Sequence, residues 1–437
     1  MLRLSAFFLY SSFMKDFFIL NLVIMKENRQ NWGHFMKKSL LLVIFLCLAM
    51  FILGCESEDS DEDASGVTVD ILDGQSEIEA GQLTAGEWND LENFPFYQSL
   101  FLASEQDEKP FYNFRTHPYF QLKEMLKVHV IFEEINVPFI EVTLKDELDE
   151  TIYQGITDIF GKVYFFPSQT EMNNIAYISL DVDGVVIIYD ETITNDILID
   201  LENLLILPET NIIDIMFVID TTGSMGDELS YLQVEIEDVM KRIQETFLDA
   251  DIRIAFLFYR DITDDYITRC FDFSSDIDSQ LEHLKDQSAG GGGDFPEASE
   301  RALYEAMRKN WTKGHSTKLL FHVADAPPHE DPESMMMYKE TLLTALNKGI
   351  KIIPVASSGV DKLTEFLMRT EAMLTGGTYV FLTNHSGIGH EKIEPSVGAY
   401  VVEYLNDLLV RLIKTYHSGE IFDKIPFNQQ NQQNNSN

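Results

Sequence analysis

The chain has 437 residues, and its 45% hydrophobic and 12% aromatic content predicts two or three packed domains and excludes a disordered polymer. Acidic residues outnumber basic ones by 72 to 32, which gives a net charge of −40. Such a surface repels phosphate backbones and argues against nucleic-acid binding, whereas it suits an extracellular or periplasmic protein, or one that works with cations.

The longest apolar run follows Met36, in "MKKSLLLVIFLCLAMFILGC". A basic start followed by an apolar stretch predicts a secretory signal peptide. The ending "ILGC" resembles the lipobox of bacterial lipoproteins, which implies that residues 36–55 are a lipoprotein signal and that Cys55 is lipidated. A transmembrane anchor is the alternative, but the run is shorter than the roughly 20 residues that span a bilayer. We interpret residues 1–35 as the product of a start codon assigned too far upstream.

Residues 56–126 are predicted to be an acidic tether and a connecting region. The run "ESEDSDEDASG" after Cys55 cannot bury apolar surface. In some Gram-negative groups such residues direct lipoproteins to the cell surface, so a periplasmic and a surface location both remain open. Cys270 is the only cysteine after Cys55, so no intramolecular disulfide is predicted.

Short segments rich in Val, Ile, Tyr and Phe fill residues 127–206, among them "KVHVIF", "KVYFFP", "IAYISLDVDG", "VVIIYD" and "DILIDL". Their separation by Asp, Gly, Asn and Pro predicts a small antiparallel β-sandwich. The stretch "TDIFGKVYFFP", from Thr157 to Pro167, resembles the turn of carboxypeptidase-regulatory-like domains. That family implies a spacer or display platform and no peptidase activity.

From Asn211 onward, strands alternate with helices. Apolar strands such as "IIDIMFVID", "IRIAFLFYRD", "KLLFHVAD" and "IKIIPVAS" are separated by segments of helical spacing, such as Glu228–Phe247 and 297–310. This pattern predicts an α/β fold with a doubly wound, mostly parallel sheet. The helix "VVEYLNDLLVRLIKTY" closes the fold, and residues 418–437 are predicted to be a polar low-complexity tail.

Small oxygen-bearing side chains follow the strand "IIDIMFVID", in the sequence "DTTGS". Asp220, Thr222 and Ser224 alternate along this loop, and Asp325 follows another strand. Ligands of open α/β sheets bind beyond the carboxyl ends of the strands, and hard divalent cations such as Mg²⁺ prefer these oxygens. Each element alone has a plainer explanation, a helix N-cap or an ordinary turn, but together they predict a metal site. Without sulfur or imidazole, the set is a poor fit for zinc.

The combination resembles the metal-ion-dependent adhesion site of a von Willebrand factor type A domain, over residues 211–417. "DTTGS" matches that family's Asp-x-Ser/Thr-x-Ser motif, and Asp325 matches its aspartate after a central strand. The resemblance implies a bound Mg²⁺, or Mn²⁺ or Ca²⁺. It also implies a partner protein that offers an Asp or Glu carboxylate to the metal.

One position departs from the family pattern. A threonine usually stands on the Gly-rich loop, whereas "GGGGDFPEA" has Asp294 there. As a metal ligand, direct or through water, Asp294 adds a third negative charge, which should raise cation affinity and weaken the attraction for an acidic partner. Alternatively, Asp294 caps the following helix. His322 is predicted to pack within the sheet, and His329 to lie in the loop after Pro328.

Two classes of function remain. The first is a lipid-anchored binding module of the bacterial cell envelope that uses its cation for protein recognition or adhesion. The second is a metal-dependent hydrolase, or an accessory subunit of an ATPase or envelope complex. The sequence has no G-x-S-x-G, H-E-x-x-H or G-x-x-x-x-G-K-S/T motif, so no enzymatic activity is predicted.

Overall fold

The computed structural model describes residues 78–428, apart from 104–108, 203–209, 294 and 390–391. These residues belong to one compact unit, Ser76–Asn437. The predicted upstream start, the signal segment, Cys55 and the acidic run after it lie outside the described residues, as does Asp294. Within the described part, no helix is both long enough and apolar enough to cross a membrane.

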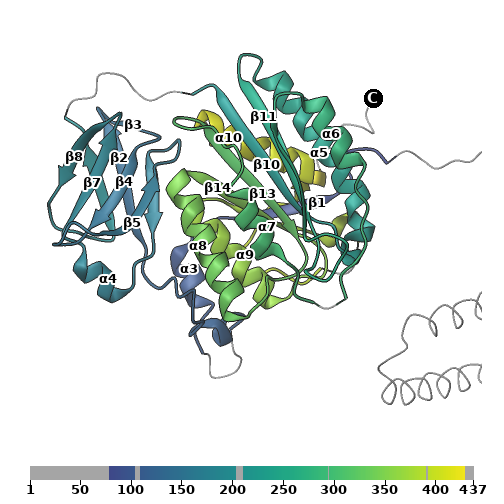
Figure 1. Ribbon diagram of the computed structural model, residues 1–437, viewed down its shortest axis with the longest axis horizontal. Coiled ribbons are helices and arrows are strands. Elements are labelled where there is room, and N and C mark those ends of the chain that lie inside the picture. Colours follow the sequence, from purple (N-terminus) through teal and green to yellow (C-terminus); the bar gives the residue numbers. More distant parts are fainter. Residues whose placement is uncertain (1–77, 104–108, 203–209, 294, 390–391, 429–437) are drawn as a thin grey trace, which may run out of the picture. The chain divides into compact units, whose positions relative to one another are not determined.

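A large mixed sheet forms the centre of the described structure (Figure 1). Its eight described strands run in the order β12-β11-β10-β13-β14-β15-β1-β16. Strands β11, β10, β13, β14 and β15 are parallel, while β12, β1 and β16 pair antiparallel at the edges. The prediction of an α/β fold with a mostly parallel sheet is therefore confirmed. The strands are β1 (Thr84–Trp88), β10 (Ile212–Asp220), β11 (Asp251–Tyr259), β12 (Thr268–Ser274), β13 (Thr317–Ala324), β14 (Ile350–Ala356), β15 (Tyr379–Leu382) and β16 (Glu403–Tyr404).

Strand β10 shows why these strands read as unbroken apolar runs. Its side chains alternate between two core clusters, with Ile215 and Phe217 in one and Met216 and Val218 in the other. Both faces are apolar because helices cover both. Helices α5 (Gly226–Thr246), α6 (Ile277–Lys285) and α10 (Leu405–Ser418) pack on the first face (Figure 1). Helices α3 (Phe94–Ser99), α7 (Ser299–Ala306), α8 (Pro332–Lys348) and α9 (Lys362–Thr375) pack on the second.

The segment before residue 126 corrects the predicted domain boundaries. Strand β1 lies inside the sheet between β15 and β16. Part of the predicted connecting region therefore belongs to the large sheet and the helices that cover it, which we call the α/β unit. The buried carboxylate of Glu235 on α5 accepts the backbone N–H groups of Gly81 and Gln82, both at 2.8 Å. Buried Arg369 on α9 donates to both oxygens of Asp90, at 2.8 and 2.6 Å. The sequence "TAGEW" gave no signal for a strand because it is short and carries Gly and Glu.

A second group of strands, which we call the β unit, lies between β1 and β10 in the sequence. It comprises two four-stranded sheets, β3-β2-β6 with β9 beside β2, and β5-β4-β7-β8, and their apolar side chains meet in one cluster. Its strands are β2 (Leu126–Phe132), β3 (Ile135–Asn136), β4 (Glu141–Lys145), β5 (Thr151–Ile156), β6 (Lys162–Phe165), β7 (Tyr177–Val182), β8 (Val185–Tyr189) and β9 (Asp196–Asp200), with helix α4 (Gln169–Asn174). The alternating burial of β7 and β9 fits strands with one buried face. The resemblance of this unit to carboxypeptidase-regulatory-like domains stays a prediction.

The stretch "TDIFG" forms the tight turn between β5 and β6. Thr157 accepts the N–H of Ile140 and donates to the carbonyl of Val137. One oxygen of Asp158 accepts two further backbone N–H groups, each at 2.9 Å. Gly161 has a φ of 68°, and a Cβ there would lie 2.4 Å from the carbonyl oxygen of Val130. Only glycine fits this position.

The predicted polar tail begins later than the sequence suggests. The backbone N–H of Ile425 donates to Glu403, and that of Phe427 to the carbonyl of Val402. Lys424 forms an ion pair with Glu87 at 2.7 Å. The first residues after α10 therefore pack beside β1 and β16.

Candidate functional site

Acidic side chains gather where three neighbouring parallel strands end. Asp220 is the last residue of β10, and it is in register with Tyr259, the last residue of β11. Ile219 pairs with Val323 on β13, so Asp325 follows two residues further along the neighbouring strand. Asp261 lies just beyond β11 and is buried as well. The carboxyl edge of the sheet thus collects carboxylates that are far apart in the sequence.

The loop after β10 brings three of the predicted site residues together. One oxygen of the fully buried Asp220 accepts the N–H of Thr222 at 2.8 Å and its hydroxyl at 2.7 Å. The hydroxyl oxygens of Thr222 and Ser224 are 3.1 Å apart. Among the described residues, nothing donates to the other oxygen of Asp220. This loop therefore presents one unmatched carboxylate oxygen beside two hydroxyl groups.

The Gly-rich loop closes over this cluster. The N–H of Gly290 donates to the carbonyl of Thr221, and the carbonyl of Gly291 accepts the N–H of Gly223. Gly292 has a φ of 74°, and a Cβ there would lie 3.0 Å from a carboxylate oxygen of Glu297. Glycine therefore allows the loop to approach the carboxylates closely.

Asp294, the third predicted carboxylate and the one on this loop, lies outside the described residues, so its side chain is not placed. The following helix, α7, begins at Ser299 and has Ala298 as its N-cap residue. The alternative in which Asp294 caps this helix is therefore wrong, because the cap falls four residues later. The predicted helix over 297–310 is also shorter at both ends.

Burial and repulsion between carboxylates shift the pKa of Asp220, the acid at the centre of this site. Burial and then the negative charge of Asp325 raise the pKa of Asp220 to about 7. Asp325 itself is 4% exposed. Carboxylates packed together in this way favour bound protons or a bound cation. The site therefore fits a positive ligand on physical grounds.

Glu297 is a site residue that sequence analysis did not single out. It is 3% exposed, and burial, followed by the charge of Asp220, raises the pKa of Glu297 to about 9. Among the described residues, one of its oxygens has no hydrogen-bond partner. The signal was present in the sequence, since Glu297 follows the glycines in "GGGGDFPEA", but helix propensity alone explains a Glu at that place.

His329 closes one side of the cluster. Its Nε2 lies 3.1 Å from Asp261, and its Nδ1 lies 3.3 Å from Glu300. Neither acid was predicted, although Asp261 directly follows the strand "IRIAFLFYR" and so satisfies the rule used for Asp220. The prediction that His329 lies in a loop after Pro328 is met by its position before α8.

His322 packs inside the sheet, as predicted. It is 2% exposed, and its Nδ1 lies 2.9 Å from Glu371 on α9. The hydroxyl group of Tyr259 lies 3.2 Å from its Nε2. This imidazole is a core group beneath the acidic edge and does not belong to the candidate ligands.

The donor set is compatible with a hard cation. Over the described residues, no group of three or more His, Cys, Asp and Glu side chains is arranged to hold a metal ion. The candidate set instead combines two carboxylates with two hydroxyl groups, and Asp294 lies outside the described residues. Mg²⁺ is often bound by one or two carboxylates and keeps several waters, so a set of this kind suits it.

Fold and site together define an α/β domain with an acidic ligand site at the carboxyl edge of its parallel strands. Residues 214–387 match the family model of the von Willebrand factor A domain. The chain therefore contains a von Willebrand factor A domain, a type of domain commonly used in protein–protein interaction.

Three similar proteins each match part of this chain. An ariadne-like RING finger protein of the Acanthamoeba polyphaga mimivirus is 34% identical over 121 residues, which are 27% of this chain and 11% of that protein. The alpha-protein kinase vwkA of Dictyostelium discoideum is 29% identical over 119 residues, or 27% of this chain and 19% of the kinase. The chain thus spans less than a fifth of either relative. The crystal structure of the conserved hypothetical protein BatB from Bacteroides thetaiotaomicron is 13% identical, with a TM-score of 0.32, covering 47% of this chain and 99% of that one.

Proposed function

We propose that the A domain binds a divalent cation, Mg²⁺ or else Mn²⁺ or Ca²⁺, and uses it to recognise a partner protein. Asp220, Thr222, Ser224 and Asp325 would hold the ion, and Asp294 would contribute directly or through water. The observation that carries the proposal is the unmatched oxygen of Asp220, buried beside a second carboxylate. A cation would supply the positive charge that this arrangement lacks.

The chain's own residues orient the site. Two donors from Thr222 fix one oxygen of Asp220, so the second oxygen keeps a defined direction. Ser224 is exposed, which puts its hydroxyl group at the boundary between the buried acids and solvent. A carboxylate from a partner's Asp or Glu would approach on this side. We propose adhesion or protein binding and no enzymatic activity.

The proposed setting is the bacterial cell envelope. A lipid on Cys55 would anchor the chain to a membrane, the acidic residues after it would form a tether, and the β unit would act as a sandwich-type spacer. Its support is the "ILGC" ending of the apolar run and the acid-rich segment that follows.

The metal proposal is tested by thermal and urea unfolding of residues 76–437 with Mg²⁺ or with chelator. Selective binding to the folded state stabilises it by about 2.7 kcal/mol at a hundredfold excess over the Kd. We expect this gain in the wild type and its loss in Asp220→Ala and Asp325→Ala. Asp278→Ala, at an exposed position of α6, is the matched control and should respond to Mg²⁺ like the wild type. An equal Mg²⁺ response in all four proteins would remove the ion from these residues.

The recognition step is tested with any protein captured from native membranes by this unit in Mg²⁺. Binding should disappear in chelator and in Ser224→Ala. Capture that survives both changes would place the recognition surface elsewhere, for instance on the β unit.

The anchor is tested by Cys55→Ser in the full chain. The wild type should partition into the detergent phase, and the variant into the aqueous phase or a stalled precursor. Wild type found only in the aqueous phase would refute the lipoprotein interpretation.

A further inference from the structure

One edge of the β unit is open. Strand β8 ends the sheet β5-β4-β7-β8, and among the described strands it pairs only with β7 (Figure 1). Three of its five residues are exposed apolar side chains, since Val185 is 63% exposed, Val186 61% and Ile188 52%. Single apolar side chains are common on protein surfaces. An uncharged apolar strand at the edge of a sheet is different, because it is a template on which another strand can pair.

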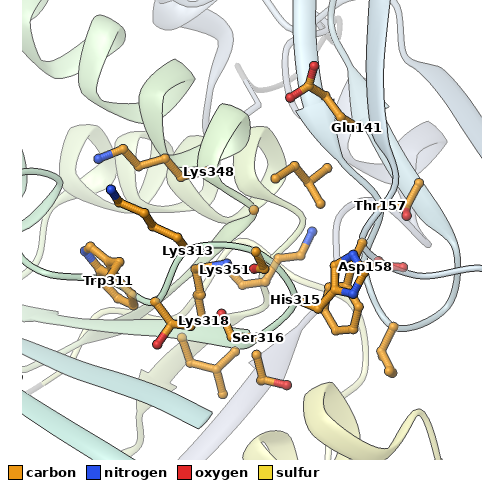
Figure 2. Close-up of a pocket in the computed structure, with 18 of the residues that line it drawn as sticks. Glu141, Thr157, Asp158, Trp311, Lys313, His315, Ser316, Lys318, Lys348 and Lys351 are labelled. Atoms are coloured by element: carbon orange, nitrogen blue, oxygen red, sulfur yellow. Dashed lines mark hydrogen bonds between the residues drawn. The ribbon is translucent and has the colours of Figure 1, made fainter. Parts of the chain in front are cut away.

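Other edges of the β unit are covered or short. Strand β5, at the opposite edge of the same sheet, packs on α8, where a Cβ on Gly155 would lie 2.8 Å from the side chain of Leu346. Residues of both units also line a pocket on this side (Figure 2). In the second sheet, β6 packs on the core of the α/β unit through Tyr164, and β3 has only two residues. Covered or very short edge strands offer little to a further strand.

Strand β9, another edge, is protected by charge. It pairs with β2, and its exposed side chains are Asp196, Leu198 and Asp200. If two copies of β9 paired around Leu198, Asp196 of one copy would lie opposite Asp200 of the other. Like charges directly opposite each other are destabilising, and charged residues on edge strands commonly prevent such pairing. Strand β8, with the sequence "VVIIY", lacks this protection.

The backbone of β8 presents hydrogen-bonding groups to the open side. The two-residue turn Asp183-Gly184 joins β7 to β8. Because bonded and non-bonded pairs alternate in an antiparallel ladder, the odd-numbered residues of β8 exchange hydrogen bonds with β7. The N–H and C=O groups of Val186 and Ile188 therefore point to the open edge. Within the described residues, no loop or side chain forms a hydrogen bond with them.

A second copy of β8 fits this edge. Antiparallel pairing around a twofold axis at Ile187 places Val186 of one copy opposite Ile188 of the other. Both residues point their N–H and C=O groups outward, so each such pair can exchange two hydrogen bonds. Their side chains share one face, opposite to Ile187 and Tyr189, which pack on the core of the β unit. On the outer face, apolar side chains would therefore meet apolar side chains.

The charges near β8 are compatible with this pairing. The carboxylate of Asp183 in the turn lies 3.4 Å from the imidazole of His315 in the α/β unit, and is thus directed away from the edge. Asp190, just after β8, would lie opposite Gly184, which has no side chain. Because the chain has a net charge of −40, an uncharged strip is the surface on which two copies repel each other least.

We propose that β8 is the interface of a homodimer in which the sheets β5-β4-β7-β8 of two copies join into one continuous sheet. A single strand pair buries less than the about 1,200 Å² of standard interfaces, so we expect a weak dimer, with a Kd on the order of 100 μM. The interface does not include the carboxyl edge of the α/β unit. Dimerisation is therefore independent of the proposed cation.

Sedimentation equilibrium of residues 76–437, from micromolar to millimolar concentration, tests the proposal. The wild type should pass from monomer to dimer. Ile188→Lys puts a charge opposite Val186 of the second copy and should raise the Kd about tenfold or more. Leu198→Lys on β9, at a position 56% exposed, is the matched control and should dimerise like the wild type. Asp220→Ala should also dimerise like the wild type, with Mg²⁺ or with chelator.

Both lysine variants change exposed side chains and should melt like the wild type, which separates lost association from lost folding. A wild type that stays monomeric at millimolar concentration overturns the proposal. An equal Kd in Ile188→Lys and Leu198→Lys overturns it as well, because association would then not use β8.

Disulfide cross-linking tests the register, in a Cys270→Ser background that removes the one cysteine of residues 76–437. In the proposed pairing, the Cα atoms of Val186 and of Ile188 in the second copy are about 5.5 Å apart, within the reach of a disulfide. A mixture of Val186→Cys and Ile188→Cys copies should therefore cross-link on oxidation. In either variant alone the cysteines lie diagonally, about 7–8 Å apart, and should cross-link much more slowly. Equal rates in the mixture and in the single variants contradict the twofold pairing.

Discussion

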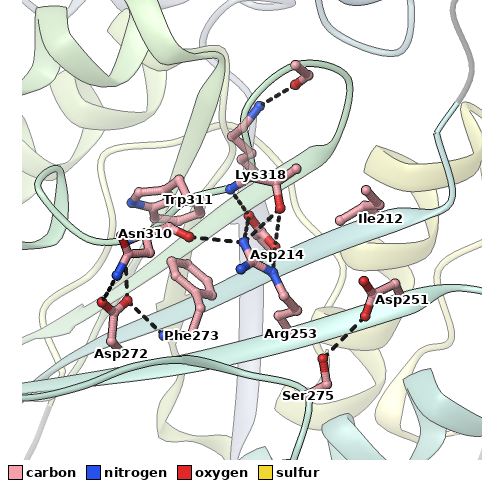
Figure 3. A network of polar contacts seen from close by, with 12 residues as sticks. Ile212, Asp214, Asp251, Arg253, Asp272, Phe273, Ser275, Asn310, Trp311 and Lys318 are labelled. Atoms are coloured by element: carbon pink, nitrogen blue, oxygen red, sulfur yellow. Dashed lines mark hydrogen bonds and ion pairs between the residues drawn. The ribbon is translucent and has the colours of Figure 1, made fainter.

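Asp214 and Asp220 stand near opposite ends of one strand, β10, and both are fully buried. Both oxygens of Asp214 accept hydrogen bonds. Arg253 donates to each of them (Figure 3), and the backbone N–H of Thr312 donates to one at 2.6 Å. Asp220 receives donors on one oxygen only. Two aspartates of equal burial thus differ in role. Asp214 is a structural group, whereas Asp220 has an oxygen that no described residue donates to and that can bind a ligand. Burial alone does not mark a site; the balance of donors does.

The largest effect is expected from removing the carboxylate of Asp214, whose two oxygens both accept hydrogen bonds. Asp214→Ala leaves the guanidinium of Arg253 facing the strand without its carboxylate, and we expect a loss of about 3 kcal/mol in the free energy of unfolding. Urea unfolding of residues 76–437 measures it. Asp251→Ala, an exposed acid on the next strand, is the control and should stay within about 0.5 kcal/mol of the wild type. Equal costs for the two variants would show that Asp214 is no more structural than a surface acid.

The second prediction concerns Lys318, the base beside Asp214. The folded state lowers its pKa from 10.5 to about 8, so between these pH values the folded protein binds fewer protons than the unfolded one. Stability due to this group should therefore rise with pH across that window, by about 2 kcal/mol. Unfolding of the wild type and of Lys318→Met from pH 7 to pH 10.5 measures the difference. A difference that stays constant over this range contradicts the burial of a charged amine.

The third prediction removes the charge at the open end. Asp220→Asn keeps an oxygen for Thr222 but ends the repulsion with Asp325. In chelator at pH 8 we expect the variant to be more stable than the wild type by about 1 kcal/mol, the opposite sign from Asp214→Ala. Asp214→Asn, measured in parallel, should be less stable than the wild type. If Asp220→Asn also destabilises, the two acids play the same role and the comparison fails.

The smallest effect is expected at Asp294. Replacing it with Thr removes one negative charge near the cation site, so Mg²⁺ affinity should fall about threefold, while binding of an acidic partner should be unchanged or stronger. Calorimetric titration with Mg²⁺ compares the variant with Asp265→Thr, an exposed acid used as the control. Tighter Mg²⁺ binding in Asp294→Thr would exclude this carboxylate from the ion's surroundings.

What could be foreseen from the sequence depended on how far apart the interacting residues lie. Asp220, Thr222 and Ser224 share one short loop, so their meeting follows from local spacing, and Asp325 follows from the rule that parallel strands end at one edge. Glu297 does not follow a strand, so the rule for strand ends does not predict it. The pocket drawn in Figure 2 could not be predicted from the sequence, because it forms only when β13, β14 and the β unit are placed against one another.

Strand β1 was not predicted for a related reason. An unbroken apolar run identifies a strand such as β10, and alternation of apolar and polar residues identifies a strand such as β7. Strand β1 has few apolar residues and is held mainly by partners from distant parts of the chain. Leu83 and Ala85 fill the core, Glu235 binds the segment ahead of β1, and Arg369 binds the one after it. None of these contacts leaves a pattern in "TAGEW" itself.

The early position of β1 in the chain has a kinetic consequence. The hydroxyl groups of Thr84 and Thr383 are 2.8 Å apart, yet 299 residues separate them in sequence. Closing a sheet across such a distance is slow, because chain entropy is lost before the contact is made. On a ribosome or a translocation channel, β1 emerges long before β15 and β16, its two neighbours. Until those strands arrive, β1 has neither of its neighbours in the sheet, so the A domain should be the last part of the molecule to fold and the part most dependent on a chaperone.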